Sequence, residues 1–139
     1  MFSIGDLSKL TKVKIPTIRY YEQVGLLPTA ERTDGNQRRY STSGLERLSF
    51  IKHSRDLGFS IDAISSLIEL QSHPDRTCQA ATDIAVAQLL DVRQKIRKLR
   101  ALEKELKRIT SGCNGESTAA ECYILASLAD HGLCRHAEH

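Results

Sequence analysis

The chain has 139 residues, of which 40% are hydrophobic, 27% charged and 5% aromatic, with no Trp. This composition is too apolar for a disordered tail and too poor in aromatics for a protein that stacks single-stranded bases. No apolar run could span a bilayer, and the first ten residues contain Asp6 and no signal-type apolar stretch, so we expect a cytoplasmic protein with no membrane partner. In that compartment the four cysteines indicate reduced thiols, as metal ligands or reactive groups, rather than disulfides.

The net charge of +3 is unevenly distributed along the chain. Residues 1–58 carry 10 Lys or Arg against 6 Asp or Glu, and residues 76–110 carry 9 against 4. The segments 59–75 and 111–139 are acidic. Two basic blocks favour nucleic acid as a partner, although the second block also fits a solvated helix face.

The first elements expected are two short helices. Ser3 precedes an apolar row of Ile4, Leu7 and Leu10 and predicts a capped helix over about 3–10. Pro16 suits the first turn of a second helix, which ends at Gly25. Two short helices joined by a tight turn form the helix-turn-helix pattern.

Residues 31–40 are expected to form a β-ribbon, or wing. Asp34-Gly35 is a hairpin-turn signal, and a basic strand follows it. Two further helices, about 43–57 and 61–71, then follow, with His73-Pro74-Asp75 breaking the second.

Residues 76–110 contain no Pro and no Gly and predict one long helix. Apolar residues recur at alternating spacings of four and three, interrupted only by Glu103. Such a helix would be about 50 Å long and has no core of its own, so we infer a homodimer, with antiparallel helices favoured but not dictated by the pattern. The alternative is a single long helix packed on its own domain. Gly112 ends the helix, and a loop over 113–122 and one or two helical turns follow.

These elements resemble those of the MerR family of bacterial transcriptional regulators, over essentially the full length of the chain. The motifs are IGDLSKLTKVKIPTIRYYEQVGLLP, with R-Y-Y-E-x-x-G-L-L at 19–27 the most specific part, and R-x-x-G-N-Q-R-R-Y in the wing. Gln37 stands where members often carry an aromatic residue. The resemblance implies a mainly α fold, with a winged helix-turn-helix DNA-binding domain (1–75), an antiparallel coiled-coil dimerisation helix (76–111) and a metal-binding loop and tail (112–139).

The DNA-binding residues expected lie on the second helix and on the wing. In a helix-turn-helix protein the second helix enters the major groove, and short side chains near its N-terminus meet the bases. Tyr21 is expected in the core. The candidates for DNA contact are Thr17, Arg19, Tyr20, Arg38, Arg39 and Tyr40. Alternation along a strand allows one of the two wing arginines to reach DNA, and the family pattern favours Arg38.

The family resemblance also implies a switch at a promoter. Members repress in the absence of the effector and, with the effector bound, bend and untwist the operator so that RNA polymerase holoenzyme can use it. No nucleophile–base pair or phosphate loop indicates an enzyme.

Three cysteines are the candidate effector site. Cys78 and Cys113 lie at opposite ends of the long helix, about 50 Å apart, so they cannot share an ion within one chain. In an antiparallel dimer, Cys78 of one protomer would meet Cys113 and Cys122 of the other, as in the metal-sensing branch of the family. Three thiolates suit Zn(II), Cd(II), Pb(II) or Hg(II), and the choice among the four stays open.

Two questions about the cysteines remain open in the sequence. Weaker candidate ligands lie in the tail, namely Cys134, His131 and His136. A thiol-based redox or electrophile sensor on the same scaffold is the alternative function.

Overall fold

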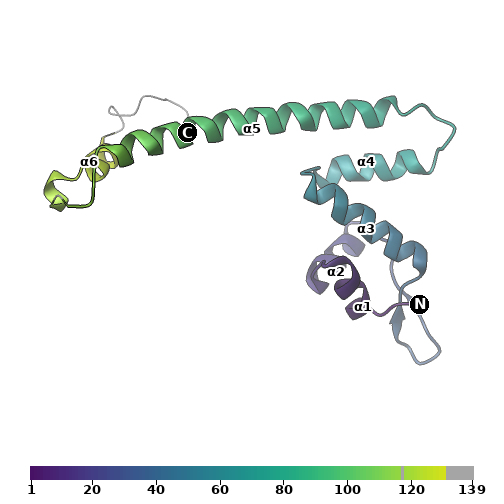
Figure 1. Cartoon of the computed structure of the whole chain (residues 1–139). Helices are drawn as coiled ribbons and strands as arrows, with labels where there is room; N and C mark the ends of the chain where they lie inside the picture. Colours follow the sequence, from purple (N-terminus) through teal and green to yellow (C-terminus); the bar gives the residue numbers. More distant parts are fainter. Residues whose placement is uncertain (117, 131–139) are drawn as a thin grey trace. The chain divides into compact units, whose positions relative to one another are not determined.

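The computed structural model describes residues 1–116 and 118–130 (Figure 1). The chain forms two compact units, residues 1–84 and 85–139, and each is described by itself below. Within the described residues, no helix is both long and apolar enough to cross a membrane. The fold is mainly helical, with one small two-stranded sheet, as the sequence predicts.

The first unit begins with the two expected short helices, α1 (Ile4–Thr11) and α2 (Ile15–Gln23). A reciprocal capping box starts α1, since the Ser3 hydroxyl accepts from the Asp6 N–H and the Asp6 carboxylate accepts from the Ser3 N–H, both at 3.0 Å. Lys12, in the left-handed conformation with φ 61°, ends α1 and makes the turn to α2 short. The helix-turn-helix is therefore set mainly by local chemistry.

The wing consists of β1 (Glu31–Arg32) and β2 (Arg38–Arg39), which pair antiparallel with Glu31 opposite Arg39. The positive φ of the turn falls at Asn36, at 61°, rather than at Gly35. A contact that the sequence analysis did not anticipate closes the base of the wing. Phe2 and Tyr40 exchange two backbone hydrogen bonds of 2.8 and 2.7 Å, which attaches the N-terminus to the end of β2.

Helices α3 (Thr42–Asp56) and α4 (Ile61–Gln71) complete the packing of the first unit. Ser41 and Ser60 cap them through their hydroxyls, and Gly58, at φ 89°, follows the end of α3. The core consists of apolar and aromatic side chains from every helix so far named and from the loops around the wing: Leu7, Val13, Ile18, Tyr21, Leu26, Leu27, Tyr40, Leu48, Ile51 and Ile64.

Two apolar residues at the ends of α1 and α2 lie outside this core. Leu10 is 60% exposed and Val24 is 44% exposed. Leu10 lies in the last turn of α1, and Val24 is the residue that ends α2, so neither faces the packed side. Tyr21, expected in the core, is buried there.

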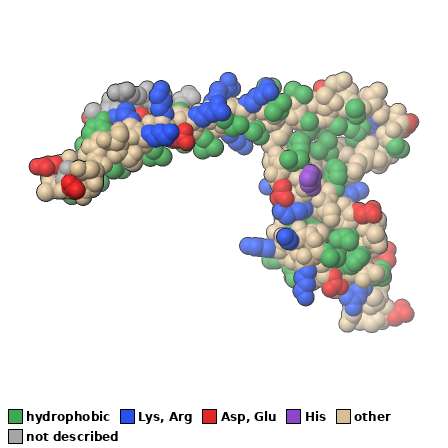
Figure 2. All heavy atoms as spheres, viewed as in Figure 1, with side chains coloured by type: hydrophobic (Ala, Val, Ile, Leu, Met, Phe, Trp, Pro, Cys, Tyr) green, Lys and Arg blue, Asp and Glu red, His purple; other side chains and the backbone are tan. Residues whose placement is uncertain are grey.

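The long helix α5 (Gln79–Ser111) is continuous over 33 residues, and the boundary between the two units falls inside it. Its apolar stripe is exposed in the single chain, and Figure 2 shows hydrophobic side chains along one edge of the helix and basic ones along the other. The exposed members are Leu89, Val92, Ile96, Leu99 and Leu106. The functional boundaries expected after residues 75 and 111, between the DNA-binding domain, the dimerisation helix and the metal-binding segment, stay a prediction.

At the end of α5, a loop leads through a short 3-10 turn, η1 (Ala119–Glu121), to α6 (Tyr123–Ala129). Helix α6 packs on the last turns of α5, where Glu105, Ile109 and Ser127 are buried. This small contact is the only buried cluster among the described residues of the second unit.

Candidate nucleic-acid interface and thiol site

Helix α2 presents two of its predicted DNA-binding residues to solvent. Arg19 is exposed and Tyr20 is 48% exposed, while Ile18 and Tyr21, next to them in sequence, are buried. Thr17 lies half-buried in the first turn of the helix. The alternation of buried and exposed residues turns one face of α2 to the core and leaves the other free for a partner.

Arg19 from α2 and Arg38 from the wing act on a common point, the hydroxyl of Tyr40. Burial raises the pKa of that hydroxyl well above its usual value, and the Glu22 carboxylate raises the pKa further, whereas Arg38 and Arg19 oppose the shift. Two positive charges from different elements therefore lie around one site. Exposed guanidinium groups of this kind are suited to contacts with DNA phosphates.

Tyr40 itself is placed differently from the prediction. Its side chain is 2% exposed, and its hydroxyl donates a hydrogen bond to the Glu22 carboxylate of α2. This position does not fit a direct contact between the Tyr40 side chain and DNA, so the predicted role is corrected. Tyr40 instead joins the base of the wing to the helix that carries Arg19.

The two wing arginines differ in exposure, as alternation along a strand requires. Arg38 is exposed, whereas Arg39 is half-buried and donates to the Gln37 side chain at 2.9 Å. Arg39 also acts on Asp6, whose pKa is lowered chiefly by the backbone and side chain of Ser3. Arg38 is therefore the better placed of the two for an external phosphate.

The structure brings two of the three candidate thiols together. Cys113 follows the end of α5, and Cys122 immediately precedes α6, and their Sγ atoms are 3.8 Å apart. Two thiolates on one tetrahedral zinc ion, with Zn–S bonds of about 2.3 Å, also lie about 3.8 Å apart. Both side chains are half-buried, so the pair is accessible from solvent.

The Cys122 thiol is also favoured as a thiolate. Its pKa is lowered chiefly because the backbone N–H of Leu125 donates to the sulfur, and burial acts in the opposite direction. The Cys113 thiol and the N–H of Ile124 lower the pKa further. The first turn of α6 therefore favours the thiolate of Cys122, and the thiolate is the form in which a cysteine can bind metal.

Among the described residues, Cys78 is the one remaining candidate ligand. Cys78 is exposed and lies just before α5, at the opposite end of that helix from Cys113. Among residues 1–116 and 118–130, no three His, Cys, Asp or Glu side chains are grouped closely enough to hold an ion. Cys134, His131 and His136 lie outside the described residues.

Sequence reasoning missed the residues that support these sites. Glu22 holds Tyr40, and Arg47 of α3 donates to the Leu26 carbonyl at 3.3 Å. At the thiols, Arg108 contacts both Glu105 and Tyr123. The Glu105–Arg108 pair could have been predicted from its spacing of three on a helix. The other contacts join residues far apart in the sequence, and no local pattern predicts them.

Comparison with family models agrees with this architecture. A model described as "MerR HTH family regulatory protein" matches residues 2–71, and one described as "MerR, DNA binding" matches residues 45–109. The chain belongs to the MerR family. As a MerR-family member it is a DNA-binding transcriptional regulator and not an enzyme.

Individual relatives are similar over nearly the whole chain. The chain is 37% identical over 130 residues to the HTH-type transcriptional regulator ZntR of Escherichia coli (strain K12), covering 92% of both. It is 34% identical to the mercuric resistance operon regulatory protein of Bacillus cereus, covering 91% of this chain and 96% of that one.

A solved structure is similar to the same extent. The transcription regulator PbrR691 from Ralstonia metallidurans CH34, in complex with lead(II), superposes with a TM-score of 0.76 at 38% identity. The match covers 92% of this chain and 99% of that one. The MerR-family fold predicted from the sequence is therefore confirmed.

Proposed function

We propose that this MerR-family chain is a metal-responsive regulator that binds promoter DNA as a homodimer in the cytoplasm. A divalent soft or borderline ion binds Cys113 and Cys122 of one protomer together with Cys78 of the partner subunit. The dimer then distorts the operator so that RNA polymerase holoenzyme transcribes metal-resistance or efflux genes. The observation that carries the proposal is the Cys113–Cys122 separation of 3.8 Å, which fits two thiolates on one ion.

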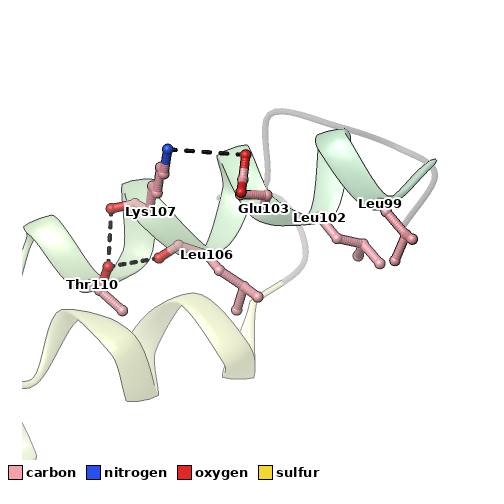
Figure 3. Close-up of a pocket in the computed structure, with 6 residues that line it drawn as sticks. All are labelled: Leu99, Leu102, Glu103, Leu106, Lys107 and Thr110. Carbon is pink, nitrogen blue, oxygen red and sulfur yellow. Dashed lines mark hydrogen bonds and ion pairs between the residues drawn. The ribbon is translucent and has the colours of Figure 1, made fainter. Parts of the chain in front are cut away.

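The dimer is supported by the apolar surface of α5. Near the end of the helix this surface forms an open groove of about 420 Å³. Figure 3 shows Leu99, Leu102 and Leu106 along one side of α5. The groove is also lined by Glu103, Lys107 and Thr110. Leu99 and Leu106 are exposed and lie seven positions apart, and such a row fits the same row of a second copy.

The antiparallel orientation is supported by the positions of the cysteines. A 33-residue helix is about 50 Å long, and Cys78 and Cys113 flank its two ends. In an antiparallel pair, each end of one helix meets the other end of its partner. This arrangement would bring a third thiol to the Cys113–Cys122 pair, which has no third ligand grouped with it among the described residues of one chain.

The choice of a metal effector is supported by the relatives and by the thiol chemistry. One of the similar proteins is named for mercuric resistance, and another was solved in complex with lead(II). Three thiolates carry negative charge that a divalent cation offsets, and sulfur ligands select soft or borderline ions. We therefore propose Zn(II), Cd(II), Pb(II) and Hg(II) as the candidate effectors.

The metal site is tested by titrating the dimer with each of these four ions and following thiolate-to-metal absorption. We expect about one ion per chain, and the Cys113→Ser variant should bind more than about 100-fold more weakly, beyond the loss typical of outer-shell changes. The variant should bind promoter DNA as the unsubstituted chain does. Equal loss of metal binding and DNA binding would contradict the proposal.

The DNA site is tested with Arg19→Ala, since Arg19 is exposed on α2. Removing one phosphate contact should weaken promoter binding and reduce the slope of log K against log salt by about 1. Lys52→Ala is the matched control, because Lys52 of α3 pairs with Asp56 at 2.7 Å. An unchanged slope for Arg19→Ala would remove Arg19 from the interface.

The thiol geometry also keeps a redox sensor as the second candidate function. Cys122 has a lowered pKa and lies against Cys113. Hydrogen peroxide would take two electrons and two protons from the pair of thiols, which would become a disulfide, and the peroxide would become two water molecules. Transcription triggered by peroxide alone, with no ion bound per chain, would favour this function over metal sensing.

A further inference from the structure

We infer that Gly112, Tyr123, Arg108 and Glu105 form a positioning device, called here the anchor, that holds the Cys113 and Cys122 thiols side by side before an ion arrives. The inference deepens the proposed metal function and rests on it for its purpose, although the anchor can be tested without metal. The anchor residues touch no ion. They act through the two cysteines that they flank.

The two halves of the anchor are the immediate sequence neighbours of the two thiols. Gly112 precedes Cys113, and Tyr123 follows Cys122. A Cβ on Gly112 would lie 2.9 Å from Cγ of Tyr123 and closer still to Cδ1, so the Tyr123 ring occupies the space that any side chain would need. The absence of a side chain at residue 112 thus lets the end of α5 and the start of α6 touch.

Arg108 fixes the Tyr123 ring in this place. One of its terminal nitrogens, Nη1, donates to the Tyr123 hydroxyl, and its Cζ lies 5.6 Å from the centre of the ring. Its Nε donates to both Glu105 oxygens, at 3.1 and 3.2 Å, and its Nη2 pairs with the same carboxylate. Because Glu105 and Arg108 lie one turn apart on α5, the helix itself orients the guanidinium toward the ring.

The burial of this cluster distinguishes it from an ordinary surface ion pair. Glu105 is only 4% exposed, and Ile109 and Ser127 beside it are 5% and 2% exposed. By contrast, every described residue of the loop between the two cysteines is exposed. The anchor is therefore the packed structure that sets where this loop begins and ends.

A fixed pair of loop ends matters for capture of an ion. If the loop were free, ordering the two thiols would cost conformational entropy at the moment of binding. With the anchor in place, the two thiols are already ordered when the chain folds, as supporting residues order metal ligands in other proteins. We therefore expect that loosening the anchor lowers affinity for any species that must bind both thiols.

The first test uses the metal-free full-length dimer and phenylarsine oxide, a trivalent arsenical that binds two neighbouring thiols. Gly112→Ala and Tyr123→Leu should reduce its affinity for the Cys113–Cys122 pair by about 10- to 100-fold, the range for outer-shell changes at metal sites. Leu128→Ala is the matched control, because Leu128 lies on α6 but is 70% exposed. The helix content and the dimer mass of each variant are measured alongside.

The second test repeats the series with Cd(II) alone, read by thiolate-to-metal absorption against a competing chelator. Tyr123→Phe separates the two parts of the anchor, since it keeps the ring against Gly112 but removes the hydroxyl that accepts from Arg108. Its affinities should fall between those of the unsubstituted chain and Tyr123→Leu. Because Tyr123→Phe keeps the ring, we expect it to stay folded even if Gly112→Ala or Tyr123→Leu unfolds the C-terminal unit.

Each outcome decides a separate point. Loss of affinity for both probes with unchanged helix content and mass supports the anchor, and so does the intermediate Tyr123→Phe. Unchanged affinities in Gly112→Ala and Tyr123→Leu, or in Tyr123→Phe should those two unfold, overturn the inference. A further outcome separates the two proposals. If the chain binds the arsenical in a way that depends on the anchor but does not bind Cd(II), the anchor is supported and the metal-responsive function is refuted.

Discussion

The two units of the chain differ in how many apolar side chains they bury within a single copy. Residues 1–84 enclose ten apolar and aromatic side chains in one core. In residues 85–139, the described part buries one apolar side chain, Ile109, and leaves a row of leucines in solvent. The first unit is therefore complete as a single copy, whereas α5 has an apolar face that requires a second chain.

The difference teaches which changes act within one chain and which act between chains. A substitution in the first core should change the stability of the DNA-binding fold. A substitution on the exposed row of α5 should change association between copies and leave that fold intact. The predictions below test this division.

The largest effect is expected for Leu99→Asp, which places a charge on the exposed apolar row of α5, where Leu99 is 63% exposed. Loss of a buried leucine from each of two protomers costs about 3–6 kcal/mol, or roughly 100- to 10,000-fold in the dimer dissociation constant. Sedimentation analysis should show monomers at concentrations where the unsubstituted chain is dimeric.

Gln94→Asp is the control for this change, because Gln94 lies on the side of α5 away from the leucine row. Gln94→Asp should leave the mass of the dimer in solution unchanged. In Leu99→Asp, the unfolding of residues 1–84 should remain cooperative, whereas Leu48→Asp, at a position with 0% exposure, should abolish it. A dimeric Leu99→Asp chain would contradict the division between the units.

A smaller effect is expected for Tyr40→Phe within the first unit. The change removes the hydroxyl that donates to Glu22 and leaves the carboxylate without that partner. We expect a loss of about 1–2 kcal/mol in the free energy of unfolding, measured by urea denaturation. Tyr20→Phe, at an exposed position, should have almost no effect on stability.

Tyr40→Phe also tests the corrected role of Tyr40. Since the side chain is buried, promoter affinity should fall much less than in Arg19→Ala, and the salt slope should not change. A salt slope reduced as much as in Arg19→Ala would return Tyr40 to the DNA surface.

The smallest effect is a pH dependence at the start of α1. The pKa of Asp6 is lowered below its usual 3.8, chiefly by the backbone and side chain of Ser3. The charged carboxylate therefore contributes stability at neutral pH, and this contribution is lost as the pH falls from about 4 through the lowered pKa. The stability difference between the unsubstituted chain and Asp6→Asn should be constant near neutral pH and shrink in acid, as thermal melts at several pH values would show. A difference that grows in acid would have the wrong sign.

The elements that sequence reasoning predicted well are those fixed by neighbours along the chain. Ser3, Ser41 and Ser60 cap their helices through residues three positions away, and the heptad spacing of α5 is visible within one helix. Such signals need no knowledge of the tertiary fold. The meeting of Cys113 and Cys122 was also expected, from the resemblance to the metal-sensing branch of the family, and their Sγ atoms are 3.8 Å apart.

The features that were missed depend on contacts between distant residues. Tyr40 follows two wing arginines and shares their sequence context, yet its bond to Glu22 spans 18 positions and buries it. The Arg108–Tyr123 contact spans 15 positions and joins two helices. No periodicity encodes either pair, since each depends on how separate elements pack.

The bridge between Phe2 and Tyr40 has a consequence for synthesis and handling of the chain. Phe2 and Tyr40 are 38 positions apart, so the pairing that closes the base of the wing belongs to the slower, non-local steps of folding. Met1, 68% exposed, lies directly beside the closed bridge. An affinity tag fused there would extend the chain from the base of the wing.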